Sequence, residues 1–295
     1  MTHEEERLQL IDKLKGMNPM YRKVPVPADE QGQKDLVRIL MNVWMPAPLS
    51  QDFLDLQDSY LKKESMLKGI VDERTLEPLG SDPRLYLWQG DITRLKVDAI
   101  TNAANSGMTG CYVPLHGCID NFIHSAAGLE LRLECSRIMR RQGYEEPTGR
   151  AKITPGYCLP AKYVLHTVGP IVDGGILTDE HRNLLRSSYR SCLELAEQNR
   201  LESIAFCCIS TGVFMFPAEE AAEIAVETVR EYLNEQDDRY SEIASFIGCE
   251  ENEKPYRGIK RVIFNVFKDR DREIYERLLQ VESTQILHAA DSEIR

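Results

Sequence analysis

The segment of residues 110–128, GCYVPLHGCIDNFIHSAAG, places two thiols and an imidazole within one short stretch. Zinc prefers thiolate sulfur and imidazole nitrogen, and a catalytic zinc site uses three protein ligands and leaves one coordination position open. Cys111, His116 and Cys118 supply such a set, so they form a candidate zinc site with an open fourth position. Their spacing is not that of a zinc finger, and cysteine is among the residue types most often buried. A buried loop that happens to contain sulfur is therefore the alternative interpretation.

A helix is predicted directly after Cys118, because apolar residues recur with helical spacing from Ile119 to Ala127. Asp120 would lie in its first turn, where the helix dipole stabilises an acid, or its carboxylate would face a ligand. His124 lies one turn later on the same side of the helix, and we expect it to have a structural role. A cysteine nucleophile activated by a histidine of the same stretch is a further alternative for this segment.

Two other polar stretches follow predicted strands. Asp91, in GDIT (residues 90–93), either caps a turn or accepts a hydrogen bond from an exocyclic amine such as that of adenine. Asn102 and Asn105 frame the stretch NAAN. Asparagine is a poor strand residue, so this pair indicates either turn chemistry or hydrogen bonding to a sugar.

A third stretch, ISTGVFMFP (residues 209–217), leads from a predicted strand into a predicted helix. Gly212 would allow a positive φ here, and successive backbone N–H groups could then bind an anion. Phe214 and Phe216 could offer a ring for stacking. A plain strand–helix turn with two core aromatics explains the same residues equally well.

The elements that must position these loops alternate between strand and helix after residue 84. β-branched or aromatic runs bounded by Gly, Pro, Ser or Asp predict strands, and longer runs with helical spacing and N-terminal caps predict helices. Such alternation indicates a three-layer α/β/α sandwich, with ligand-binding loops beyond the carboxyl ends of the strands. The predicted strands lie in residues 85–92, 97–105, 162–170, 203–211 and 261–267, and further predicted helices lie in residues 178–199, 217–236 and 271–282.

The first 80 residues show a different pattern. Apolar residues recur with helical spacing in three segments separated by prolines, which predicts short helices joined by extended links. Leu36 and Leu40 belong to an apolar stripe of the second segment, and such a stripe must be buried against another surface. We therefore expect residues 1–80 to dock as a helical extension on a main domain of residues 81–282, with residues 283–295 as a C-terminal tail.

Charge and hydropathy limit the possible partners. The formal net charge of −11 argues against binding to nucleic acid or to an anionic membrane, but backbone N–H groups can still bind a small phosphorylated ligand. The charged N-terminus lacks the apolar region of a signal peptide, and no run approaches the roughly 18 apolar residues of a membrane span. We expect a cytoplasmic monomer whose eight cysteines are reduced thiols, metal ligands or core residues.

Together, these stretches resemble the macrodomain family, which binds ADP-ribose. The resemblance rests on GDIT, VDAITNAANS, CIDNFIHSAAG, TGRAKITPGYCLPAKYVLHTVGP and SIAFCCISTGVFMFPAEEAAEIAVETV, and it runs from about Leu85 to about Leu279. Most macrodomains carry a run of glycines before the helix acid, and here GCYVPLHGC replaces it. The replacement resembles the zinc-dependent macrodomain class, a microbial group of ADP-ribosyl hydrolases with an N-terminal helical extension. The resemblance implies a macrodomain sandwich with a mixed central sheet, preceded by that extension.

The resemblance also implies roles for individual residues. Asp91 would contact the adenine amine, with Ile92 against the ring, and Asn105 and Asp120 would act at the distal ribose, where catalysis takes place. Zinc, held by the Cys-His-Cys set, would lie beside the anomeric carbon. The pyrophosphate and distal ribose would be enclosed by Ser210, Thr211, Gly212, Val213 and Phe214, together with Cys118, Ile119 and Asp120.

The preferred function is hydrolysis of the bond that joins ADP-ribose to a protein side chain, and the family favours acidic side chains. Zinc would polarise a substrate oxygen or lower the pKa of a bound water to about 7, and the transition state would carry oxocarbenium-like charge. Asp120 would orient the ribose or the water, or stabilise that charge. The alternatives are a reader module that binds ADP-ribose or mono-ADP-ribosylated protein without chemistry, and hydrolysis of O-acetyl-ADP-ribose.

Overall fold

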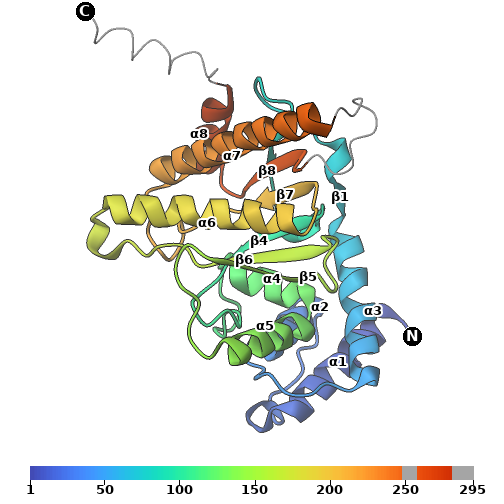
Figure 1. The fold of residues 1–295 in the computed structure, drawn as a ribbon. Helices are drawn as coiled ribbons and strands as arrows, with labels where there is room; N and C mark the ends of the chain where they lie inside the picture. Colours follow the sequence, from blue (N-terminus) through green and yellow to red (C-terminus); the bar gives the residue numbers. More distant parts are fainter. Residues whose placement is uncertain (248–257, 281–295) are drawn as a thin grey trace, which may run out of the picture.

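A mixed sheet lies at the centre of the computed structural model, which describes residues 1–247 and 258–280 (Figure 1). Its strands are β2 (Leu85–Gln89), β4 (Ala99–Ala103), β5 (Ala151–Pro155), β6 (Tyr163–Thr167), β7 (Ser203–Phe206) and β8 (Arg261–Val266). They are arranged in the order β2-β8-β7-β4-β6-β5. All neighbouring strands are parallel except β5 and β6. The predicted mixed α/β fold is therefore confirmed.

Helices cover both faces of this sheet. α4 (Ile119–Ala127) and α5 (Leu129–Gln142) connect β4 to β5, α6 (Asp179–Gln198) connects β6 to β7, and α7 (Ala218–Ile247) connects β7 to β8. Connections between parallel strands are right-handed, and the crossover from β4 to β6 moves along the sheet in the opposite direction to those from β6 to β7 and from β7 to β8. α4 and α5 therefore lie on one face, and α6 and α7 on the other. α8 (Asp269–Gln280) packs against β2 and β8.

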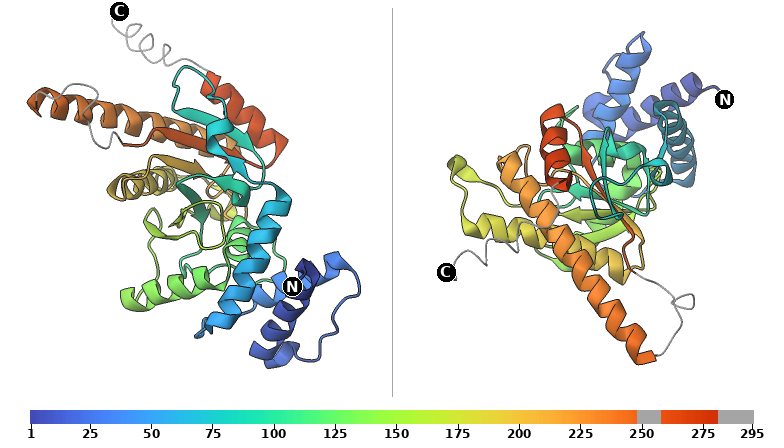
Figure 2. Two further views of the ribbon diagram at one scale, coloured as in Figure 1. Left: turned by 90° about the vertical axis from the view of Figure 1, so that its right-hand side faces the viewer. Right: turned by 90° about the horizontal axis from the view of Figure 1, so that it is seen from above.

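The N-terminal region contains α1 (His3–Met17), α2 (Glu30–Asn42) and α3 (Gln51–Lys68). Their apolar faces form a cluster of their own, in which Leu36 and Leu40 of α2 pack with Phe53 of α3 and Leu129 of α5. α2 and α3 also contact α4, and Figures 1 and 2 show the three helices beside the end of the sandwich that carries α4 and α5. The predicted apolar stripe is thus buried, and the extension packs on the main domain.

Short elements join these parts. β1 (Val71–Asp72) pairs in parallel with β3 (Leu95–Lys96), so the chain before residue 80 already contacts the loop after β2. The 3-10 helices are η1 (Pro19–Tyr21), η2 (Glu73–Thr75), η3 (Ile92–Arg94) and η4 (Asp173–Gly175). The boundaries at residues 80 and 282 remain predictions, and the predicted tail of residues 283–295 lies outside the described residues.

Two elements of the sandwich were not predicted from the sequence pattern, namely α5 and β5. The predicted helix starts agree better with the structure. The Thr178 side chain accepts a hydrogen bond from the His181 N–H and caps α6, and Pro217 lies directly before α7.

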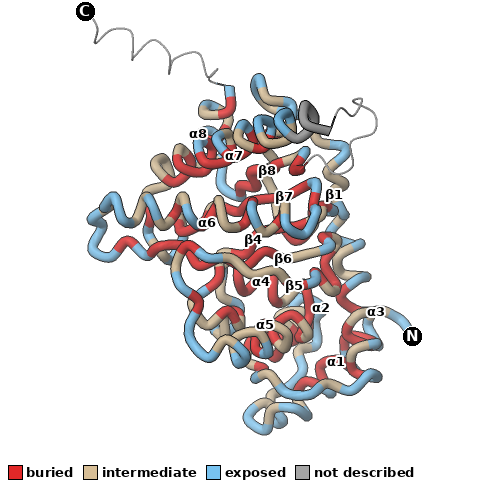
Figure 3. The backbone as a smooth tube through the Cα atoms, in the orientation of Figure 1, coloured by how far each residue is buried: buried red, intermediate tan, exposed pale blue. Residues whose placement is uncertain are grey.

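Figure 3 shows the buried residues concentrated in the strands and on the helix faces that meet them. Among the described helices, none is both long enough and apolar enough to cross a membrane.

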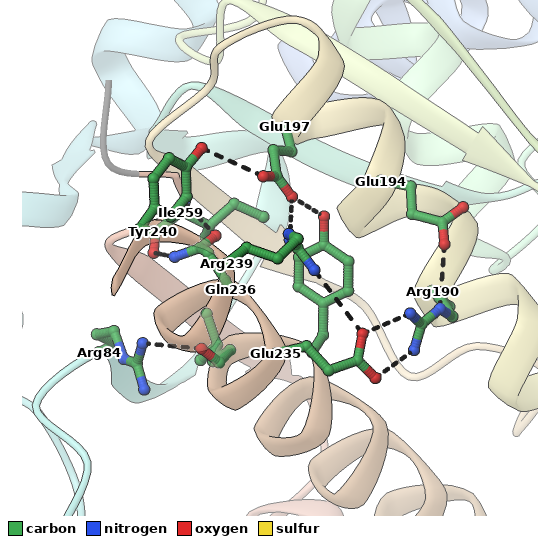
Figure 4. A network of polar contacts seen from close by, with 11 residues as sticks. Arg84, Arg190, Glu194, Glu197, Glu235, Gln236, Arg239, Tyr240 and Ile259 are labelled. Carbon is green, nitrogen blue, oxygen red and sulfur yellow. Dashed lines mark hydrogen bonds and ion pairs between the residues drawn. The ribbon is translucent and has the colours of Figure 1, made fainter. Parts of the chain in front are cut away.

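A polar network ties α6 to α7 on the face away from the N-terminal helices (Figure 4). Glu197 of α6 accepts hydrogen bonds from Arg239 at 2.8 Å and from Tyr240 at 3.2 Å. Arg190 of α6 forms two parallel hydrogen bonds with Glu235, at 2.9 and 2.6 Å. These groups satisfy one another and lie on helix surfaces, so the network fixes the pairing of the two helices.

Candidate metal-binding and ligand-binding site

The loop between β4 and α4 brings the Cys-His-Cys set together. The donor atoms of Cys111, His116 and Cys118 all lie within 4.8 Å of one another, and Cys111 Sγ lies 3.5 Å from His116 Nδ1. Cys118 occupies the N-cap position of α4. All three residues are partly exposed, so an ion can reach them from solvent.

The electrostatics of the loop fit a divalent cation. Burial raises the pKa of the Cys118 thiol to about 12, and the neighbouring Cys111 and Asp120 add to the rise. A coordinated metal ion would supply the positive charge that favours the thiolate form of Cys118 in such a place. Two sulfurs and one imidazole nitrogen also match zinc in type and number of donors.

A second group of metal-binding residue types, His124, Cys135 and His166, is buried in the described part of the chain. His166 already uses both ring nitrogens: Nδ1 lies 3.1 Å from the Asn102 amide and Nε2 lies 2.9 Å from the Thr154 hydroxyl. Burial lowers the pKa of His166 to about 3 and that of His124 well below its usual value. Both rings are therefore neutral, and the group belongs to the polar core beneath the site.

Asp120 lies in the first turn of α4, as predicted, and only 4% of its surface is exposed. Its Oδ1 accepts a hydrogen bond from Asn102 Nδ2 at 2.8 Å, and His124 Nε2 lies 3.4 Å from the same oxygen. Burial raises the pKa of this carboxyl to about 6, although the Asn102 hydrogen bond and Arg132 oppose the rise. The sequence left turn chemistry and sugar binding open for Asn102. The structure instead shows a fully buried amide that orients Asp120.

Asn105 connects Asp120 to the Cys-His-Cys loop. Its Nδ2 donates to the Gly110 carbonyl at 3.3 Å and to Asp120 Oδ2 at 3.4 Å. Gly110 has a φ of 83°, and a Cβ placed there would lie 2.8 Å from the His124 ring. Only glycine suits this position, because the backbone is left-handed and passes directly over a buried side chain.

Asp91 caps η3, which is the structural interpretation that the sequence favoured for it in isolation. Its Oδ1 accepts hydrogen bonds from the Thr93 N–H at 3.0 Å and the Thr93 hydroxyl at 2.6 Å. Its Oδ2 lies 3.6 Å from Lys68 Nζ at the end of α3. Ile92 is 1% exposed and packs in the main core. Contacts of these two residues with adenine stay predictions.

The loop of residues 209–217 differs from expectation in its backbone. The positive φ predicted at Gly212 occurs instead at Ser210 (65°) and Met215 (54°). The loop curls back on itself through a hydrogen bond from the Phe216 N–H to the Ser210 carbonyl at 3.0 Å. Phe216 is buried in the core, whereas Val213 is 66% exposed. The prediction of a positive φ at Gly212 is therefore wrong, while phosphate binding by this loop stays a prediction.

The Macro domain family matches residues 101–225. A protein-ADP-ribose hydrolase of Treponema medium is 50% identical over 281 residues, which cover 95% of this chain and 100% of that protein. The chain belongs to the macrodomain family. A protein-ADP-ribose hydrolase of Staphylococcus aureus (strain MSSA476) is 42% identical over 266 residues, covering 88% of this macrodomain chain and 92% of the relative. A crystal structure of the Trypanosoma brucei macrodomain in complex with ADP-ribose aligns with a TM-score of 0.58 at 31% identity, covering 82% of this chain and 94% of that one.

Sequence reasoning missed the residues that support this macrodomain site from outside its loops. Arg38 and Asn42 of α2, Asn121 of α4 and Arg132 of α5 all contact the Cys-His-Cys loop. Helical spacing gives no signal for Arg38 or Asn121, because both lie off the apolar stripes of their helices, where solvent exposure is expected. Their partners become visible only when the two parts of the chain are packed together.

Proposed function

We propose that this macrodomain is a zinc-dependent hydrolase that removes ADP-ribose from modified protein side chains. One observation carries the proposal: a set of three zinc-type donors lies in the same loop system as the Asp120–Asn105 pair. Two relatives named protein-ADP-ribose hydrolase, at 50% and 42% identity over most of the chain, support the reaction class. The ADP-ribose complex of the T. brucei macrodomain supports the ligand.

Cys111, His116 and Cys118 would hold the ion and leave its fourth position open toward the ligand. Zinc, when bound, would supply a Lewis acid beside the bond that breaks. Asp120 has a pKa of about 6 and is therefore mostly ionised at neutral pH. Held by Asn102, its carboxylate would accept a hydrogen bond from the distal ribose or from the attacking water. Asn105, already bonded to Asp120 and to the loop, would hold the same ribose.

The rest of the nucleotide would lie over the loop of residues 209–217 and η3. The Ser210 hydroxyl supports this placement, because it is buried and has no hydrogen-bond partner in the described part of the chain. A buried donor without a partner is costly, and a phosphate or ribose oxygen would satisfy it. Asp91 would meet the adenine amine at the opposite end of the ligand, with Ile92 beneath it.

The test combines metal analysis with a hydrolysis assay on a protein that carries ADP-ribose on acidic side chains. We expect the purified protein to hold one zinc per chain and to release free ADP-ribose. Cys118→Ala should lose the metal and at least about 100-fold in rate, because it removes a ligand itself, whereas a side chain that only orients a ligand typically contributes 10–100-fold. Cys158→Ser is a matched control, because Cys158 packs in the cluster of the N-terminal helices and, in the described part of the chain, its thiol donates to Asp58 of α3.

Full activity in a metal-free Cys118→Ala protein would exclude the zinc mechanism. If the wild-type protein binds ADP-ribose and releases none from the modified protein, the site is that of a reader module. Inactivation by alkylation to the same extent with and without bound zinc would indicate a cysteine nucleophile instead.

A further inference from the structure

The Cys-His-Cys loop has a strained backbone. Leu115 has a φ of 53°, a left-handed conformation that is rare for a large side chain. Such a conformation is strained and persists only where the surroundings impose it. Leu115 itself is 39% exposed, so its own side-chain packing is not enough to impose it.

The backbone partner of Leu115 comes from the N-terminal extension. Asn42 is the last residue of α2 and is 1% exposed. Its Oδ1 accepts a hydrogen bond from the Leu115 N–H at 3.1 Å, and its Nδ2 donates to the Ser125 hydroxyl at 2.9 Å. The second hydrogen bond fixes the orientation of the amide. Asn42 therefore holds the loop at the residue where it is strained.

Arg38, one helical turn earlier on α2, holds the next residue of the loop. Its Nη2 donates to the His116 carbonyl at 2.7 Å. Its Nε and Nη2 also donate to Asn121 Oδ1, at 3.0 and 2.7 Å, and Asn121 Nδ2 in turn donates to the Val113 carbonyl at 2.9 Å. The planar guanidinium of arginine can serve these acceptors together, whereas a lysine ammonium cannot reproduce the fork.

The other end of the loop is tied to the same helix. Arg132 of α5 donates through Nη2 to the Cys111 carbonyl at 3.2 Å, and through Nη1 to the carbonyls of Met41 and Asn42 at 3.1 and 2.6 Å. Two of the three residues that carry metal-donor atoms, Cys111 and His116, are thus linked through their carbonyls to the C-terminal half of α2.

We infer that α2 is a structural part of the metal site, with Arg38 and Asn42 as positioning residues that preset the loop so that its three donors converge. The inference rests on the proposed zinc binding. Side chains that orient metal ligands typically contribute about 10–100-fold to metal affinity. The helical extension would therefore set how tightly the macrodomain holds its ion, although α2 supplies no ligand.

The test measures zinc affinity of the full chain by competition with a chromogenic chelator. Arg38→Gln should weaken zinc binding by about 10–100-fold, and Arg38→Lys, which keeps the charge over the Phe122 ring (4.0 Å to the centroid in the arginine protein), should weaken it less. Lys34→Gln is the matched control. It removes a cation one turn earlier on α2, whose partners are Glu30 and Glu64 and not the loop.

A second readout separates positioning from general stability. Zinc that binds only the folded state raises the melting temperature, and the rise shrinks as affinity falls. We expect a smaller zinc-induced rise in Arg38→Gln than in Lys34→Gln, whatever the melting temperatures of the metal-free proteins. Should Arg38→Gln fail to fold, the comparison of Arg38→Lys with Lys34→Gln decides the question.

Equal zinc affinity in both Arg38 variants and the control would overturn the inference and leave the proposed function intact. Absence of zinc binding in the wild-type protein would instead refute the proposed zinc site. The two failures are therefore distinguishable in one series of measurements.

Discussion

Removing the Arg132 guanidinium should release the N-terminal extension from the macrodomain. Arg132 is 2% exposed, and besides its loop contact it donates to the carbonyls of Met41, Asn42 and Trp44 at 3.1, 2.6 and 3.0 Å. These carbonyls lie at the C-terminal end of α2, where a cation is favoured by the helix dipole. Arg132→Met keeps most of the side-chain volume and removes every donor.

Hydrogen bonds to a charged group contribute about 1.5–3 kcal/mol each, so four of them give an upper limit of about 6–12 kcal/mol. Burying the guanidinium offsets part of this, and removing one partner of a buried charged arrangement typically costs about 3–5 kcal/mol. We therefore expect Arg132→Met to lose about 3–5 kcal/mol in the free energy of unfolding.

Urea unfolding measures this loss, and limited proteolysis of the segment between α3 and β2 reports whether the extension undocks. The control is Arg137→Met on the same helix, because Arg137 is exposed and, among the described residues, its ion pair is with Glu134, at 3.4 Å. An exposed pair of this kind contributes at most about 1 kcal/mol. If Arg132→Met and Arg137→Met behave alike in both assays, the hydrogen bonds to α2 do not hold the extension.

Three further changes test other contacts. Asn102→Ala removes the donor that orients Asp120, and an ADP-ribose release assay should show a loss of about tenfold or more; an unchanged rate would leave Asn102 with a purely structural role. Gly110→Ala forces a Cβ against the His124 ring at a positive φ, and thermal unfolding should show a loss of more than about 1 kcal/mol, which a neutral result would contradict. Burial opposes ionisation of Glu6, but hydrogen bonds from a lysine and a serine of α3 lower its pKa. A carboxyl whose pKa is lowered in the folded protein contributes to stability above pH 4.5, the ordinary pKa of the group. This contribution is lost as the pH falls through the lowered pKa. Glu6→Gln should therefore destabilise the protein to urea more at neutral pH than at about pH 3, and an equal effect at both pH values would refute this.

The parts of the fold that the sequence predicted are those with a simple hydrophobic pattern. The apolar stripe of α2 shows the helical period directly, and β6 and β8 lie in continuous runs of mostly apolar residues, as expected for strands buried on both faces. β5 shows neither pattern, because it lies at the edge of the sheet and only Thr154 of its five residues is buried. α5 was missed for a different reason. Its sequence LELRLECSRIMRRQ is rich in charge, and Arg132 occupies a buried position that the pattern assigns to an apolar residue.

The candidate site also contains residues that the sequence predicted and residues that it did not. Cys111, His116 and Cys118 are close in sequence, and their residue types alone suggest a common ion. The residues that hold their loop could not be found by spacing, because Arg38 lies 78 positions before the His116 carbonyl that it contacts. A lone arginine on an amphipathic helix is also typical of a solvent-exposed face. Only the packing of the two parts of the chain shows its role.

The stretch GCYVPLHGC consequently does not hold its own conformation, because residues outside it hold the loop. A related protein given these nine residues in place of its glycine run would acquire two sulfurs and an imidazole. It would lack the side chains of Asn42, Arg38 and Arg132, which hold the loop backbone here through hydrogen bonds. Transfer of the proposed metal-binding loop to another protein therefore requires the helical extension to be transferred with it.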